Sequence, residues 1–131
     1  MAQEKESLHD KKYRDALAKN LRLTRKEGID AAMRKHKLDA LIVPSGGPAW
    51  LIDLVDGDSD NWDMESTSPA AVAGYPHITV PAGSYRGLPV GISFFGGAWS
   101  EPTLIKLAYA YEQATRHRLP PQLRATADLA R

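Results

Sequence analysis

Ser45, Gly46 and Gly47 form the segment of this chain whose residue types come nearest to hydrolytic chemistry. A serine placed directly after a buried strand is a recognised position for a nucleophile, and Ser45 follows the apolar run 38–43 and Pro44. The nucleophile-elbow pattern is Gly-x-Ser-x-Gly, but Val43 occupies the position of its first glycine. The pattern therefore favours a turn, in which serine and glycine are common.

Asp56, Asp58 and Asp60 alternate along the acidic stretch 53–65, as the oxygen ligands of a calcium loop do. Such a loop requires glycine at its sixth position and a bidentate glutamate at its twelfth. Counted from Asp56, these positions are Asn61 and Thr67. Because the glutamate is missing, we interpret the stretch as a solvated acidic loop and expect no metal site there.

The remaining residues that could bind metal are scattered. None of the histidines forms the i,i+4 pair of a helical zinc site, and the chain has no cysteine to supplement them (His9, His36, His77 and His117). The lack of cysteine also excludes disulfides and cysteine nucleophiles. We therefore expect neither a metal nor an organic cofactor. Trp50, which follows Gly-Gly-Pro, is a candidate for the wall of a pocket.

Composition indicates an ordinary globular chain of one domain or part of one. Of 131 residues, 43% are hydrophobic and 25% charged. No apolar run has the length of a membrane span, and the polar N-terminus does not match a signal peptide, so we expect a cytoplasmic location. Residues 1–37 are basic on balance, but their bases alternate with acids, which indicates a solvated helix face and not a nucleic-acid surface.

The hydrophobic spacing predicts α/β architecture: a small mixed sheet of about three strands, including one antiparallel hairpin, with flanking helices. The expected elements are a helix over 10–37, a strand over 38–43, a long loop over 44–65, a short helix from 68, strands over 77–80 and 89–95, and a last helix from 100. We expect Pro81 to stop the first hairpin strand and residues 83–87 to form the turn. Residues 1–9 and 125–131 are expected to be disordered. Both outer strands would be open edges, which suggests that the chain is cut from a larger domain.

Several blocks of sequence, in the same order, resemble the C-terminal end of the amidase signature family. The most extensive are SPAAVAGYPHITVPAG (68–83), GLPVGISFFGGAWSEP (87–102) and LAYAYEQATRHRLPPQ (107–122), and shorter ones lie at 13–18, 27–32, 38–44 and 46–50. The resemblance is to peptide-amidase-like members and, more distantly, to the A subunit of glutamyl-tRNA amidotransferase. It covers most of residues 1–131, which it identifies as a partial amidase domain.

The resemblance implies a reaction class, but the family's catalytic segment has no counterpart in this sequence. Family members hydrolyse carboxamides through an acyl-enzyme, with a Lys–Ser–Ser triad and an oxyanion hole built from a Gly/Ser-rich segment. No segment of this sequence matches that one, so no catalytic residue can be carried over. By position, Ser45, Gly46, Gly47 and Trp50 are candidates for part of the substrate pocket.

The sequence thus predicts the C-terminal segment of an amidase-signature hydrolase, inactive alone, with a small amide as substrate only of the complete enzyme. The alternative is a non-enzymatic interaction module that self-associates or complements an amidase N-terminal portion. We expect neither nucleic acid nor membrane as a partner. The sequence leaves open the substrate and the role of the acidic loop 53–65.

Overall fold

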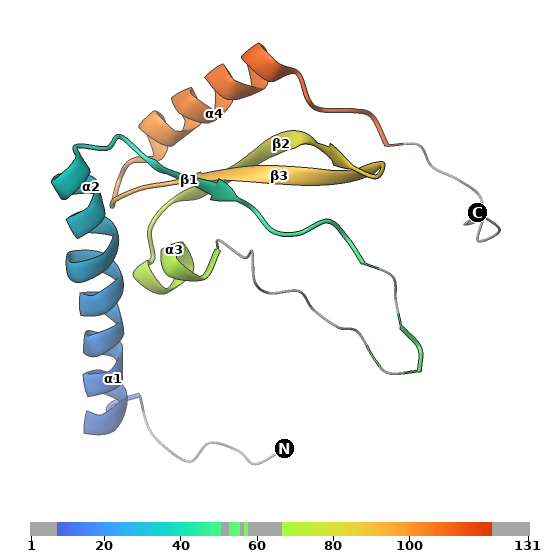
Figure 1. Ribbon diagram of the computed structural model, residues 1–131. Coiled ribbons are helices and arrows are strands. Elements are labelled where there is room, and N and C mark those ends of the chain that lie inside the picture. Colours follow the sequence, from blue (N-terminus) through green and yellow to red (C-terminus); the bar gives the residue numbers. More distant parts are fainter. Residues whose placement is uncertain (1–7, 51–52, 56, 58–66, 122–131) are drawn as a thin grey trace.

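The computed structural model of the protein describes residues 8–50, 53–55, 57 and 67–121. Figure 1 shows α4 on one face of a small sheet, α3 on the other face, and α1 and α2 beside one end of the sheet. In chain order the elements are α1 (Lys11–Leu21), η1 (Arg22–Ile29), α2 (Asp30–His36), β1 (Leu41–Pro44), α3 (Thr67–Ala73), β2 (His77–Tyr85), β3 (Leu88–Phe95) and α4 (Glu101–Thr115). The predicted α/β class, with three strands and flanking helices, is confirmed.

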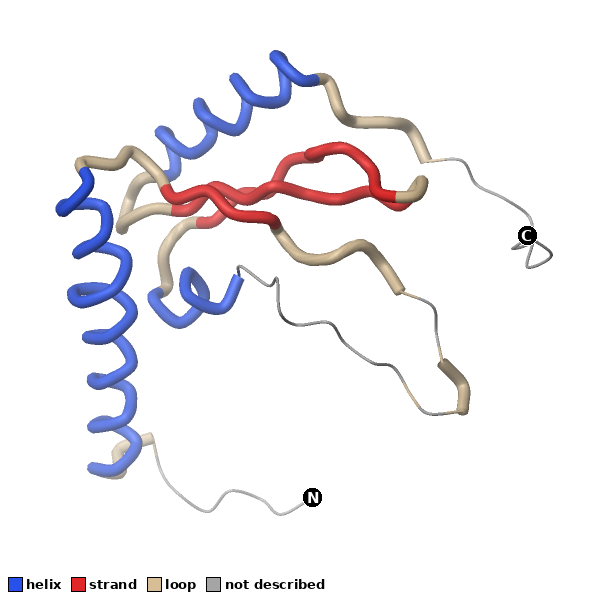
Figure 2. The backbone as a smooth tube through the Cα atoms, viewed as in Figure 1, coloured by secondary structure: helices blue, strands red, loops and turns tan. Residues whose placement is uncertain are grey.

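The strands lie in the order β1-β3-β2, so the last strand of the sequence occupies the middle of the sheet (Figure 2). Phe95 of β3 is opposite Leu41 of β1 on one side and opposite His77 of β2 on the other. The sequence predicts a mixed sheet, whereas both strand pairs in the described part of the chain are antiparallel. β1 and β2 lie on either side of β3, and both are antiparallel to it.

The hairpin of β2 and β3 is longer than predicted. The turn residues are Arg86 and Gly87, both with positive φ (51° and 80°), as in the primed turns that join antiparallel strands. The prediction that Pro81 stops the first strand is wrong. Within these three strands β2 is an edge, where a proline leaves no ladder hydrogen bond unmade, and a register shift between Pro81 and Gly83 lets the strand continue to Tyr85.

The predicted N-terminal helix over 10–37 is present, but it bends at Gly28. This residue has φ −101° and ψ −105°, outside the helical region, and separates one helical segment from the next. A Cβ at this position would lie 2.7 Å from the carbonyl oxygen of Leu23, a backbone atom that cannot yield without moving the helix. Glycine therefore permits the bend between the two helical segments.

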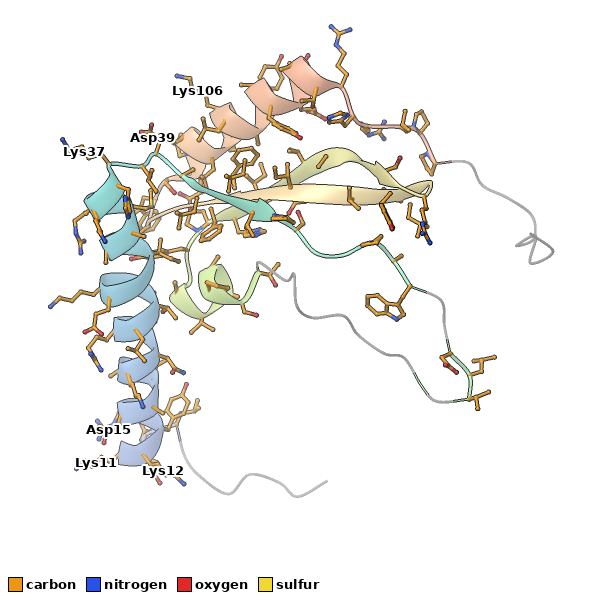
Figure 3. All side chains as sticks on the ribbon, in the orientation of Figure 1. Lys11, Lys12, Asp15, Lys37, Asp39 and Lys106 are labelled. Atoms are coloured by element: carbon orange, nitrogen blue, oxygen red, sulfur yellow. The ribbon has the colours of Figure 1, made fainter. Side chains whose placement is uncertain are left out.

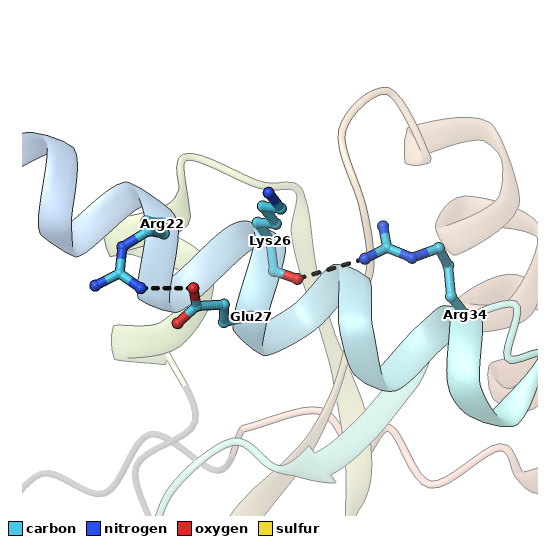
Figure 4. Close-up of polar contacts among 4 residues, drawn as sticks. All are labelled: Arg22, Lys26, Glu27 and Arg34. Atoms are coloured by element: carbon cyan, nitrogen blue, oxygen red, sulfur yellow. Dashed lines mark hydrogen bonds and ion pairs between the residues drawn. The ribbon is translucent and has the colours of Figure 1, made fainter.

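Polar contacts lie on the surface around the bend (Figure 4). A guanidinium nitrogen of Arg34 donates to the carbonyl oxygen of Lys26 at 3.4 Å, across the bend. Arg22 forms an ion pair with Glu27, and about half of each side chain is exposed. An exposed pair of this kind contributes little to stability, so the bend depends mainly on Gly28 and on packing.

Two hydrophobic clusters lie on opposite faces of the sheet. Phe94 and Phe95 are adjacent in β3 and so point to opposite faces. One cluster contains Val80, Phe94, Leu104 and Ala108, and it joins the hairpin to α4. The other contains Ile29, Ala70, Ala73 and Phe95, and it joins the sheet to η1 and α3. The sheet is therefore the middle layer of a small three-layer arrangement at this end.

Some predictions lie outside the described residues. These are the disorder expected for 1–7 and 125–131 and the acidic carboxylates Asp56, Asp58 and Asp60. Of the predicted loop 44–65, Pro44 is the last residue of β1 and residues 45–50 follow without a helix or strand. Within the described ranges, none of the helices has the length and apolar character needed to cross a membrane.

Candidate functional site

Ser45 meets two other hydroxyl-bearing residues on the α3 side of the sheet. Its backbone N–H donates to the Gly91 carbonyl oxygen at 2.9 Å, which extends the pairing of β1 with β3 by one residue. Its Oγ lies 2.7 Å from Ser93 Oγ and 3.4 Å from Thr79 Oγ1, and the Thr79 and Ser93 oxygens are 2.9 Å apart. We call Ser45, Thr79 and Ser93 the hydroxyl cluster.

The strand register explains why these residues meet. Thr79 and Ser93 are direct partners in the β2–β3 ladder, and Val43 is the β1 partner of Ser93. Because side chains alternate along a strand, Ser45 shares a face with Val43 and so with the other two hydroxyls. Gly91, two residues before Ser93, has no side chain, and a Cβ there would lie only 2.8 Å from both Ser45 Oγ and Thr79 Cγ2, so glycine lets these two side chains pack closely at this position.

Burial differs among the three hydroxyls. Ser93 is completely buried, Ser45 is half-buried and Thr79 is exposed. The buried member is satisfied by the two that reach the surface. The cluster therefore runs from the interior of the sheet to its surface.

The other predicted pocket residues follow Ser45 along the chain. Gly46 and Gly47 are in open surroundings, where a Cβ would meet no atom within 4 Å. Trp50 is 53% exposed. Among the residues that the structure describes, these three make no hydrogen bond to the hydroxyl cluster. The structure thus brings Ser45 together with Thr79 and Ser93, which sequence reasoning missed, and does not bring Trp50 to it.

His77 and Tyr75 are the two residues near this face whose pKa is displaced. Burial lowers the pKa of His77, whose ring stacks on Phe95 with centroids 6.0 Å apart. Burial and then the hydrogen bond to Asp30 raise the pKa of Tyr75. Both shifts favour the neutral form at pH 7, so these aromatic groups add no charge to the face.

Arg25 fixes α3 beside this face. Its Nε donates to the Ala73 carbonyl oxygen at 2.6 Å, and its guanidinium lies over the Tyr75 ring, 5.4 Å from the centroid. The Tyr75 hydroxyl in turn donates to Asp30 at 3.1 Å. Arg25, Asp30 and Ala73 come from segments that were predicted only as helices, so no sequence signal identified this contact.

Lysine is absent from the hydrogen bonds of the hydroxyl cluster. Figure 3 shows Lys106 on α4, which covers the opposite face of the sheet, and Lys11, Lys12 and Lys37 on the N-terminal helices. Among the residues that the structure describes, Ser45 therefore has other hydroxyls as its side-chain partners and not a general base. In the described part of the chain there is also no group of three His, Cys, Asp or Glu residues that could hold a metal ion.

Comparison with known proteins gives a consistent family. The family model described as Amidase matches residues 1–105. A probable amidase of Arabidopsis thaliana is 40% identical over 112 residues, covering 85% of this chain and 18% of that protein. The glutamyl-tRNA(Gln) amidotransferase A subunit of Clostridium acetobutylicum is 37% identical over 111 residues, covering 82% of this chain and 22% of that protein.

The fold agrees with the sequence matches. The structure of the native peptide amidase from Stenotrophomonas maltophilia superposes with a TM-score of 0.80 and 51% sequence identity, covering 91% of this chain and 23% of that chain. This chain thus spans about a fifth of the length of the relatives that it matches. With the family model matching 105 of its 131 residues, the chain belongs to the amidase signature family.

Proposed function

We propose that this chain is the C-terminal segment of an amidase-signature hydrolase and supplies sheet, helix packing and part of the substrate cavity. The parent reaction is hydrolysis of a carboxamide or amide C–N bond through an acyl-enzyme. The observation that carries the proposal is the similarity to peptide amidase over 91% of this chain but 23% of that chain. The sequence blocks at 68–83, 87–102 and 107–122 support the same assignment.

The proposal includes the absence of catalytic residues from this chain. An activated serine nucleophile needs a base within hydrogen-bond reach. Support comes from Ser45, whose side-chain partners are the hydroxyls of Ser93 and Thr79. Neither hydroxyl can serve as that base near pH 7, since serine and threonine stay protonated. We therefore expect the chain alone to be inactive toward amides.

Labelling with a fluorophosphonate probe, read by intact mass, tests this proposal. Peptide amidase of Stenotrophomonas maltophilia, treated in parallel, serves as the positive control. We expect no adduct on this chain, because a serine without a base does not attack the probe. An adduct of one probe per chain that disappears in Ser45→Ala would contradict the proposal and make Ser45 the nucleophile.

A second candidate is a non-enzymatic module that associates with a copy of itself or with an amidase N-terminal portion. Apolar side chains that remain exposed on the N-terminal helix favour it. Tyr13 and Leu17, four residues apart on α1, are each 43% exposed, and none of the α1 residues is buried. Apolar residues at this spacing form a single stripe, of the kind that helices use to pack against a partner.

A further inference from the structure

Trp99 is an exposed tryptophan in a backbone conformation that disfavours it. Its side chain is 88% exposed, and its φ is 64°, in the left-handed region that bulky residues rarely adopt. The conformation is strained in a residue with a Cβ, and the exposed indole adds the cost of apolar surface in water. Strained residues that their surroundings hold in place cluster at binding sites, so this outlier points to a contact with a partner.

Short contacts fix the turn around Trp99. Ser100, the N-cap residue of α4, donates from its Oγ to the Gly97 carbonyl oxygen at 2.8 Å, and its own carbonyl accepts from the Leu104 N–H at 3.0 Å. Gly96 lets Ser100 approach, because a Cβ on Gly96 would lie 2.8 Å from Ser100 Oγ. The turn therefore presents Trp99 in one backbone conformation, which reduces the entropy lost on binding.

The side of α4 that faces away from the sheet is also largely uncharged. Ile105 and Tyr109, four residues apart, are 58% and 62% exposed. Among the exposed residues of α4, only Glu101 and Lys106 are charged. A helix that faces water normally carries many charges opposite its buried stripe. The exposed part of α1 does so, with Lys11, Lys12, Arg14, Asp15 and Lys19. The outer side of α4 thus resembles a surface that packs against protein.

The length of the relatives indicates what covers these side chains. Peptide amidase of Stenotrophomonas maltophilia matches 91% of this chain over 23% of its own length, so the larger part of that protein has no equivalent here. Tryptophan and tyrosine are the residues that most often anchor protein interfaces. Lys106 is the only cation of α4, so attraction to nucleic acid or to anionic lipid is weak.

We infer that Trp99, Ile105 and Tyr109 form a docking surface, the α4 docking face, which binds an apolar surface of an amidase N-terminal portion with Trp99 as the anchor. This inference rests on the proposed function, because the partner follows from assigning the chain as a C-terminal segment. Burial of the indole in the complex offsets both the strained φ and the exposed apolar area of the free chain.

Co-expression tests the docking face. The partner is Stenotrophomonas maltophilia peptide amidase without the C-terminal region that this chain matches, and the reference complex is the same portion with its own C-terminal region as a separate chain. We expect the tagged wild-type chain to co-purify as an equimolar complex. Trp99→Gly removes the anchor and Tyr109→Lys places a charge in an apolar contact, so each should weaken the complex at least about tenfold.

Tyr85→Ala is the matched control, since Tyr85 is a half-exposed aromatic residue at the tip of the hairpin, and it should leave the complex unchanged. Glycine adopts a positive φ without strain, so Trp99→Gly alone should melt at or above the wild-type temperature. A lower melting temperature would mean that Trp99 supports the fold of the chain itself. That result, wild-type affinity in Trp99→Gly, or no binding by the wild-type chain where the reference complex forms would overturn the docking face.

Sedimentation of the chain alone distinguishes the other occupants. Self-association that Tyr109→Lys abolishes would assign the face to a second copy, and co-sedimentation with anionic phospholipid vesicles that Trp99→Gly abolishes would assign it to a membrane. Either result overturns the partner that we name. The proposed function is judged separately, by the reaction of the chain with the fluorophosphonate probe, and a serine–probe adduct would overturn it even where the docking face holds.

Discussion

Gly91 occupies the one position in β3 where the hydroxyl cluster requires the absence of a side chain. A Cβ there would approach Ser45 Oγ and Thr79 Cγ2 to 2.8 Å, which is closer than such atoms pack in proteins. Both neighbours are themselves held, because each hydrogen-bonds to the buried Ser93. The neighbouring side chains can therefore give way only by breaking the contacts of the cluster.

Gly91→Ala should lower the free energy of unfolding by about 1–3 kcal/mol, because the added methyl group overpacks this site. The matched control is Gly97→Ala, where the nearest atom to a new Cβ is Asp30 Oδ1 at 3.9 Å, an ordinary contact. Unfolding in urea, followed by circular dichroism, measures both. Equal midpoints for the two variants would mean that the space at Gly91 is not needed.

The hydroxyl cluster could be predicted only in part from its individual residues. Ser45 is identifiable because serine and glycine after a short apolar run form a local pattern. The strand before it was predicted to be buried, but none of the residues of β1 is fully buried. Thr79 and Ser93 carry no such pattern, since an isolated hydroxyl in a strand is common and alternation gives only its face. Their meeting with Ser45 depends on strand register, and Ser45 and Ser93 are 48 residues apart in sequence. Side-chain types alone do not encode that register.

Among the elements, α3 is held both by its two buried alanines and by a long-range hydrogen bond from Arg25. It is a short helix, and Arg25 of η1 reaches it by donating to the Ala73 carbonyl oxygen at 2.6 Å. This bond satisfies a carbonyl at the end of the helix, where no helical partner exists. The same guanidinium stacks on Tyr75, which leads into β2, so one side chain links three segments.

Arg25→Met should therefore destabilise the fold by about 1.5–3 kcal/mol, the range for a hydrogen bond from a charged donor. Arg22→Met is the matched control, since its exposed ion pair with Glu27 is expected to contribute at most about 1 kcal/mol. Thermal unfolding in parallel measures the two effects. If Arg22→Met were as damaging as Arg25→Met, general helix propensity or charge would explain the loss better than the contact with α3.

The elements themselves are largely predictable, because hydrophobic spacing sets their type. The helices over 10–37 and from 100, and the strand after residue 88, follow from such spacing. The errors occur where a tertiary setting overrides a local rule. Pro81 ordinarily ends a strand, but it is tolerated in β2 because that strand is an edge and the register shift follows it. Gly28 is a weak point in the helical pattern, but the spacing does not say whether the helix bends there.

In the whole molecule, the sheet is covered unevenly. Its two hydrophobic clusters lie toward the α4 and α3 sides, while α1 extends beyond the sheet (Figure 1). Apolar side chains of α1 remain exposed. If the chain is an interaction module, this exposed stripe is the surface that contacts the partner. Its residues are part of an otherwise charged helix, so the apolar stripe is narrow.

If the stripe mediates self-association, the chain should sediment as a dimer at high concentration and dissociate on dilution. Leu17→Lys should then weaken dimerisation by at least about tenfold, because it places a charge in an apolar contact. Ile105→Lys, on the exposed side of α4, is the matched control and should have no effect. A chain that is monomeric at every concentration rules out the self-association form of this candidate.

The strand order β1-β3-β2 also indicates the order in which the strands pair during folding. β1 pairs only with β3 in the described part of the chain, and its partner Phe95 lies far beyond it in sequence. A chain emerging from the ribosome would hold β1 unpaired until the hairpin of β2 and β3 had been made. Local hairpins close quickly, whereas pairing across a long intervening segment is slow. Of these three strands, we therefore expect β1 to be the last to pair, although it precedes the other two in the sequence.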